Sequence, residues 1–265
     1  MSTTTDPEPV LSMTGVSKRF GAVQALKDIE FHVSPGEVVA LVGDNGAGKS
    51  TLVKAIAGVY TPDDGDVVYD GKHVNITSPS QAQALGIATV FQDLALCDNL
   101  DVVGNLFLGN EVTRGPALDE VSMERQSWKL LRELSAKIPS VRIPVASLSG
   151  GQRQTVAIAR SLLGEPKVVM LDEPTAALGV AQTAEVLNLV ERLRERGLAV
   201  ILISHNMSDV MAVADRVSVL RLGRNNGDFR VADTNTQEII AAITGASTNA
   251  VTARAARRGH EEEQS

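Results

Sequence analysis

The sequence predicts an α/β fold, because short apolar runs typical of strands alternate with segments of helical character. The run 38–42 leads into a glycine-rich loop and then into a helical segment at 52–57. Two more apolar runs, 168–171 and 198–203, lie on either side of a segment with helical spacing, 181–196. This alternation is typical of a sheet whose strands are joined by helices.

The glycine-rich loop identifies the first candidate site. It matches the pattern G-x-x-x-x-G-K-[ST], and the strand before it and the helix after it supply the context that this pattern needs. Backbone N–H groups of such a loop point inward at phosphates, and the helix adds its positive end. Lys49 would bridge the β- and γ-phosphates and Ser50 would bind Mg²⁺. The chain is therefore predicted to bind a nucleoside triphosphate through Gly43, Asp44, Asn45, Gly46, Ala47, Gly48, Lys49, Ser50 and Thr51.

Two carboxylates close the apolar run 168–171. Asp172 and Glu173 stand where this strand is predicted to end, so they would face a cation or water at the carboxyl edge of the sheet. Asp172 is placed to be a second protein ligand of Mg²⁺. A solvated strand end is the alternative, and the phosphate loop upstream makes it the weaker one.

A second anion site is predicted at the start of the helix 153–163. Ser149, Gly150, Gly151 and Gln152 precede this helix, and a helix start exposes unpaired N–H donors. The alternative is that Ser149 is only a helix N-cap. Two single residues stand at the ends of further strands: Gln92 follows the β-rich run 87–91, and His205 follows the run 198–203. A lone histidine at such a place is more often structural than catalytic.

Composition excludes several classes of protein. The 265 residues include 43% hydrophobic and 22% charged residues, which is typical of an ordinary globular chain. The formal net charge of −7 argues against a broad nucleic-acid interface, and no nucleic-acid partner is expected. A single cysteine, Cys97, fits a reducing compartment. Neither a signal peptide nor a membrane-spanning run is recognisable, so a cytoplasmic location is expected.

The chain is expected to form one domain over residues 10–245, with tails at 1–9 and 247–265 that are predicted to be disordered. Short strands are predicted before the phosphate loop, and Phe20 there could stack on an adenine or serve as an ordinary core or hairpin residue. Residues 98–145 change to helical spacing, with a helix expected over 123–138. An inserted helical subdomain is predicted over about 93–158.

Together these motifs resemble the ATP-binding cassette of ABC transporters. They are the phosphate loop at 43–51, Gln92, the L-S-G-G-Q signature at 148–152, the strand and acids at 168–173, and His205. The resemblance covers about 10–245. It implies a P-loop NTPase fold with a RecA-like core, an antiparallel β-subdomain that holds the base, and a helical subdomain that carries the signature.

The resemblance also implies how such a site would work. Two chains would close head to tail on two ATP molecules, and the signature residues of one chain would cap the γ-phosphate held by the other. Glu173 would be the general base that polarises the attacking water. His205 would contact the γ-phosphate, and Gln92 would sense this phosphate and the Mg²⁺.

The particular residues of these motifs resemble those of bacterial importers of the ribose, xylose and fructose type. The chain would serve such an importer as a single cassette that pairs with itself. Its partners would be transmembrane permease subunits and, indirectly, a sugar-binding protein. It would then lie on the inner face of the cell membrane. The alternatives are a cassette for another transported substrate, or a cassette ATPase without a transporter. One departure is Gly179, where cassettes usually carry an aspartate.

Overall fold

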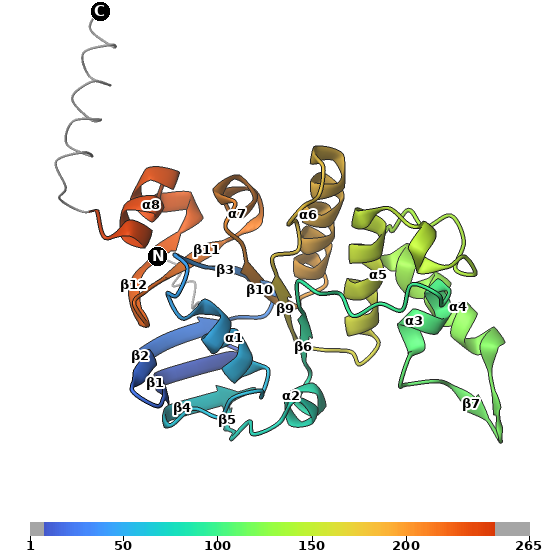
Figure 1. Ribbon diagram of the computed structural model, residues 1–265, viewed down its shortest axis with the longest axis horizontal. Helices are drawn as coiled ribbons and strands as arrows, with labels where there is room; N and C mark the ends of the chain where they lie inside the picture. Colours follow the sequence, from blue (N-terminus) through green and yellow to red (C-terminus); the bar gives the residue numbers. More distant parts are fainter. Residues whose placement is uncertain (1–7, 247–265) are drawn as a thin grey trace, which may run out of the picture.

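The computed structural model describes residues 8–246, and a mixed six-stranded sheet lies at its centre (Figure 1). The neighbours in this sheet are parallel except for the last hairpin, β11–β12. In spatial order the strands are β12 (Arg224–Arg230), β11 (Arg216–Arg221), β3 (Val38–Gly43), β10 (Ala199–Ile203), β9 (Val168–Asp172) and β6 (Ile87–Val90).

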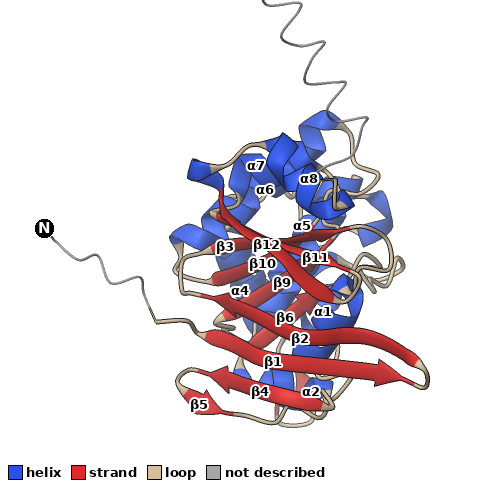
Figure 2. Ribbon diagram, turned by 90° about the vertical axis from the view of Figure 1, so that its left-hand side faces the viewer, coloured by secondary structure: helices blue, strands red, loops and turns tan. Residues whose placement is uncertain are grey.

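A second, antiparallel sheet lies beside the first, as Figure 2 shows. It is formed in spatial order by β2 (Val23–Val33), β1 (Leu11–Phe20), β4 (Asp64–Tyr69) and β5 (Lys72–His73). Helix α1 (Lys49–Ile56) packs between the two sheets, because its apolar residues share one core with both. The short helix α2 (Pro79–Leu85) leads from this sheet to β6.

Strand β3 shows how the sequence builds two cores around one sheet. Side chains of successive strand residues point to opposite faces. Val39 and Leu41 pack in the core that includes α1 and the antiparallel sheet, whereas Val38, Ala40 and Val42 pack in the core formed with the helices of the other face. An apolar run without alternation is expected for a strand that is covered on both faces. The predicted α/β fold is confirmed.

The helical part lies at one end of the molecule, beyond β6 (Figure 1). It contains α3 (Val102–Phe107), a small hairpin of β7 (Thr113–Arg114) and β8 (Ala117–Leu118), α4 (Glu120–Glu133) and α5 (Gly150–Leu162). Helices α6 (Val180–Glu195), α7 (Met207–Val213) and α8 (Thr236–Thr244) complete the chain. Of the helices between residues 8 and 246, none has the length and apolar character needed to cross a bilayer.

The predicted bounds of two helices were wrong. The helix expected over 123–138 is α4, which begins at Glu120 because Asp119 caps it, with the Asp119 side chain accepting from the Ser122 N–H. It ends early, and Ser135 just beyond it has a φ of 49°, a left-handed conformation that is incompatible with a continuing helix. The helix expected from 153 begins at Gly150. The predicted tails lie outside the described residues, except for Glu8 and Pro9.

Candidate functional site

The parallel strands place the phosphate loop and three single predicted residues at one edge of the sheet. The carboxyl ends of β3, β10, β9 and β6 lie side by side, and Ile203 at the end of β10 is in register with both Leu41 and Asp172. The segments that follow these strands carry the phosphate loop, His205, Glu173 and Gln92, each within two residues of its strand end. Ligands of open α/β sheets bind at this carboxyl edge.

Two glycines of the loop have conformations that other residues rarely adopt. Gly43 has a φ of 152°, and a Cβ at this position would overlap the carbonyl oxygen of Leu220. Gly48 caps α1 with a φ of 105°, and a Cβ there would lie 2.9 Å from the carbonyl oxygen of Ala25. The loop therefore needs glycine both for its turn and for close packing against β2 and β11.

Lys49 is held inside the loop. Its Nζ donates hydrogen bonds to the carbonyl oxygens of Gly43, at 2.7 Å, and of Asp44, at 3.1 Å. Burial lowers the pKa of the Lys49 ammonium, whereas Glu173, Asp44 and Asp172 act in the opposite direction. The ammonium is thus positioned before any ligand arrives, with a cluster of acids around it.

A cavity of about 480 Å³ brings the predicted residues together. Gly43 and Asp44 do not line this cavity. Their carbonyl oxygens accept hydrogen bonds from Lys49, which does line it. The predicted residues that line it are Asn45, Gly46, Ala47, Gly48, Lys49, Ser50, Thr51, Gln92, Asp172, Glu173 and His205.

The two acids at the end of β9 have unusual surroundings. Burial raises the pKa of both carboxyl groups above their ordinary values, and for Glu173 the neighbouring Asp172 adds to the effect. Oε1 of Glu173 is buried without a hydrogen bond, although Nε2 of His205 lies 3.3 Å away. Glu173 also has a φ of 51°, which is uncommon for a residue other than glycine. Such strain and such raised pKa values are characteristic of functional sites.

These pKa directions predict that Glu173 costs the folded chain stability. Its pKa is 4.5 before burial and higher in the folded chain, so folding becomes less favourable as the pH rises from 4.5 through the folded value. Glu173→Gln removes this penalty. We expect it to raise the melting temperature of the nucleotide-free chain at pH 8 and to give no gain at pH 4.

Thermal unfolding followed by circular dichroism at the two pH values measures this effect. The control is Glu195→Gln, at an exposed position near the end of α6, which should give no gain at either pH. An unchanged melting temperature of Glu173→Gln at pH 8 contradicts the prediction.

The signature residues do not line the same cavity as the phosphate loop. Ser149 caps α5 in a capping box, in which its side chain accepts from the Gln152 N–H and the Gln152 side chain accepts from the Ser149 N–H. Ser149 is therefore a helix N-cap, as the alternative interpretation has it. The first N–H groups of the helix, those of Gly150 and Gly151, still have no intrahelical acceptor. Gly150 lines a second cavity of about 490 Å³, which shares Gln92 and Glu173 with the first.

Phe20 lies at the end of β1 and does not line the phosphate-loop cavity. Its ring is 40% exposed and packs edge-on against Tyr60, with 4.9 Å between the ring centroids. Lys18 Nζ lies 5.7 Å from the same ring. Phe20 therefore occupies a hairpin position, as the alternative interpretation has it. The stacking of Phe20 on an adenine stays a prediction.

Besides Ile203 at the end of β10, five more cavity residues were not foreseen from the sequence. Gly223 donates its N–H to the Ala47 carbonyl and accepts from the Lys27 N–H, so the β11–β12 turn fastens the phosphate loop to β2. These residues carry no motif, and only the folded arrangement of β2 and β11 beside the loop identifies them. They are Val23, Gln24, Ala25, Leu222 and Gly223.

Comparison with known proteins decides the family. Residues 26–176, more than half of the chain, match the family model described as ABC transporter. The chain belongs to the ABC transporter family. The resemblance recognised from the motifs is thereby confirmed, and so is the P-loop NTPase fold.

Two curated relatives match nearly the full length of this ABC chain. It is 46% identical over 235 residues to the xylose/arabinose import ATP-binding protein of Sulfolobus acidocaldarius, covering 89% of this chain and 94% of the relative. It is 44% identical over 247 residues to the fructose import ATP-binding protein of Rhizobium meliloti, covering 90% and 95%. Among solved structures, a dimeric bacterial ABC transporter cassette matches with a TM-score of 0.70 and 25% identity, covering 83% of this chain and 98% of that one.

Proposed function

We propose that this ABC chain is the ATP-hydrolysing subunit of a monosaccharide importer, and that it acts as a pair of identical chains. The observation that carries the proposal is the single cavity that gathers the phosphate loop, Gln92, the two acids and His205. The monosaccharide comes from the two relatives, which are named for the import of xylose or arabinose and of fructose.

The cavity also fits a Mg²⁺ ion. Ser50, Gln92 and Asp172 all line it, and they offer hydroxyl, amide and carboxylate oxygens, the ligands that this ion prefers. Burial raises the pKa of Asp172, and a cation beside it would favour the ionised form. When bound with ATP, the ion would neutralise charge on the phosphates.

Glu173 is the best candidate for the general base. The raised pKa of its carboxyl brings it closer to the working pH, which favours proton abstraction from the attacking water. Nε2 of His205 lies 3.3 Å from Oε1 of this carboxylate, so it can orient the carboxylate. His205 would also contact the γ-phosphate. Lys49 holds the phosphates as a point charge.

The signature would act on the ATP of a second chain. Within one chain Ser149 and Gly151 are absent from the lining of the phosphate-loop cavity, while the first N–H groups of α5 have no intrahelical acceptor. The match to a dimeric cassette supports a pair of chains. Closing the pair on two ATP molecules would supply the mechanical step of transport.

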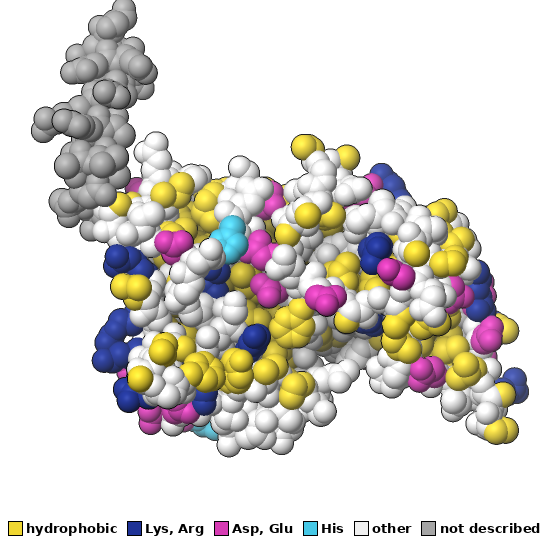
Figure 3. Space-filling model, viewed as in Figure 1, with side chains coloured by type: hydrophobic (Ala, Val, Ile, Leu, Met, Phe, Trp, Pro, Cys, Tyr) yellow, Lys and Arg dark blue, Asp and Glu magenta, His cyan; other side chains and the backbone are white. Residues whose placement is uncertain are grey.

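A groove of about 610 Å³ next to Gln92 is the proposed docking site for the permease. Its walls come from α2, β6, α3 and α5, and it is lined partly by the exposed apolar side chains of Val59, Phe91 and Leu108. Figure 3 shows apolar side chains gathered over the region of α3 and α4 on the face that it displays. Core burial accounts for Leu106 and Phe107 but not for Leu108, which is 44% exposed. An apolar groove of this kind suits a short helix of a membrane partner.

This docking site predicts a separation between ATP binding and transport. Leu108→Glu should leave ATP binding by the isolated chain unchanged, because the phosphate loop lies elsewhere. It should reduce recovery of the permease complex and sugar-stimulated hydrolysis by about tenfold or more, because a buried charge in a docking groove is costly. Co-purification with the membrane partner and hydrolysis with labelled xylose, fructose or ribose measure both effects.

Leu118→Glu is the matched control. Leu118 is 54% exposed in the helical part and does not line the groove, so this variant should assemble normally. Equal assembly and uptake by both variants would exclude this groove. A chain that recovers no membrane protein at all would instead favour a cassette ATPase without a transporter. As an importer subunit the chain would lie on the cytoplasmic face of the membrane, with a sugar-binding protein acting indirectly through the permease.

A further inference from the structure

The segment that leads into the signature has little secondary structure of its own. Between α4 and Ser149 its only regular element in the described chain is the 3₁₀ turn Val145–Ser147. It is held instead by the segment that begins α3. Val103 N–H donates to the Val141 carbonyl at 3.1 Å, and Val145 N–H donates to the Leu100 carbonyl at 3.0 Å. The position of the signature therefore depends on this pairing.

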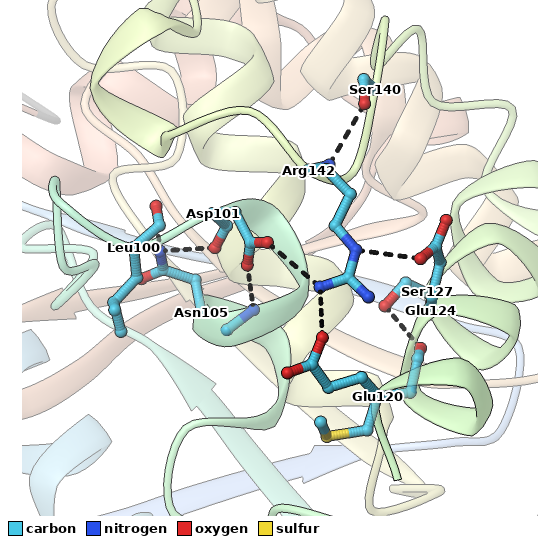
Figure 4. Close-up of polar contacts among 10 residues, drawn as sticks. Leu100, Asp101, Asn105, Glu120, Glu124, Ser127, Ser140 and Arg142 are labelled. Atoms are coloured by element: carbon cyan, nitrogen blue, oxygen red, sulfur yellow. Dashed lines mark hydrogen bonds and ion pairs between the residues drawn. The ribbon is translucent and has the colours of Figure 1, made fainter. Parts of the chain in front are cut away.

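Arg142 lies in the middle of the paired segment and connects it to two helices (Figure 4). Its Nε donates to Glu124 at 2.9 Å, and its Nη1 lies 3.2 Å from a Glu120 oxygen, both on α4. The same Nη1 lies 3.6 Å from Oδ2 of Asp101. The other oxygen of Asp101 caps α3 by accepting from the Gly104 N–H at 2.7 Å. One cation thus joins the segment that leads into the signature, the start of α3 and the first turns of α4.

Charge balance explains why a cation is needed here. Asp101, Glu120 and Glu124 bring three carboxylates around one guanidinium, and without it they would repel one another. The Arg142 side chain is 39% exposed, so each ion pair contributes little to the free energy of unfolding. The forked guanidinium instead fixes direction, because it can bind several carboxylates at once in a set geometry.

We propose that Arg142 is a positioning residue that orients the signature toward the nucleotide of the partner chain. This inference rests on the proposed function, in which Ser149–Gln152 of one chain meet the ATP of another. Without Arg142, the segment that leads into the signature loses its ion pairs to the starts of α3 and α4. The like charges there can then move apart. The signature then meets the partner's nucleotide in a less favourable orientation, while the phosphate loop of the same chain is unaffected.

The test uses the full chain carrying Glu173→Gln, in which ATP should hold two chains together. Sedimentation in the presence of ATP gives the dissociation constant of the dimer. We expect Arg142→Ala to weaken the dimer at least about fivefold, which is the lower end of measured coupling between sites. Arg142→Lys, which keeps the charge, should recover part of this loss. Asp101→Asn should weaken the dimer less than Arg142→Ala does, because asparagine keeps the cap of α3 and two carboxylates still bind Arg142.

Two measurements separate positioning from a general loss of structure. ATP affinity of the monomer should stay unchanged, and the melting temperature should fall by less than about 4 °C. Arg125→Ala is the control, since Arg125 is an exposed residue of α4 to which the described chain gives no ion pair.

A dimeric parent whose Arg142→Ala variant dimerises equally tightly overturns the inference. The inference is also overturned if the dimer is lost only when the monomer loses ATP binding as well, or only when the melting temperature falls by more than the limit given above. A parent that stays monomeric with ATP overturns the two-chain site itself, and the inference with it.

Discussion

Replacing Glu173 with glutamine is expected to lower the rate of ATP hydrolysis by about 10²–10⁴-fold, the range typical for loss of a positioned general base. Glutamine keeps the size of the side chain but has no basic oxygen for the proton of the attacking water. ATP binding should persist, because Lys49, Ser50 and Asp172 are unchanged. The steady-state rate and the ATP dissociation constant, measured on the same preparation, separate the two effects.

The expected companion of this slow hydrolysis is a long-lived dimer formed with ATP. The wild-type chain under the same conditions is the control, and it should form the dimer only transiently because it hydrolyses the nucleotide. Near wild-type turnover of Glu173→Gln would show that the base lies elsewhere.

Lys49→Ala and Ser149→Arg are expected to abolish turnover for different reasons. Lys49→Ala removes a charged contact to the phosphates, which typically contributes about 1.5–3 kcal/mol, so ATP affinity of the isolated chain should fall about tenfold or more. Ser149→Arg places a bulky charge at the start of α5, outside the cavity of its own chain. It should leave ATP affinity of the monomer close to that of the wild type.

Binding of a fluorescent ATP analogue to dilute monomer measures this difference. Ser149→Ala is the control for the lost capping box, which alone costs about 1 kcal/mol of stability. If Ser149→Arg lost nucleotide binding as severely as Lys49→Ala, the signature would act within its own chain.

Much of the site could be predicted from sequence because its parts are local. The phosphate loop is a continuous stretch of sequence, so its pattern can be recognised directly. Its glycines are needed for close packing of the backbone, as at Gly48. Asp172, His205 and Gln92 each follow a recognisable strand, and parallel strands bring their carboxyl ends to one edge without further information. The fold class followed from the same strands and helices.

The remaining parts depend on contacts between distant segments, which no local pattern encodes. Leu222 and Gly223 join the cavity because the β11–β12 turn lies against the phosphate loop. Arg142 is one charged residue among many in sequence, and its three carboxylate partners lie 18 to 41 positions away. The end of α4 was predicted too late because apolar spacing continues to Ile138, whereas the backbone turns at Ser135.

A mixture of the two inactive variants tests the shared site most directly. In a dimer of one Lys49→Ala chain and one Ser149→Arg chain, the phosphate loop of the second chain and the signature of the first are both intact. Random pairing leaves about one quarter of all sites whole, so the mixture should regain up to about one quarter of wild-type hydrolysis while each variant alone stays inactive. No recovery at any mixing ratio, or activity of Ser149→Arg by itself, would contradict a site built from two chains.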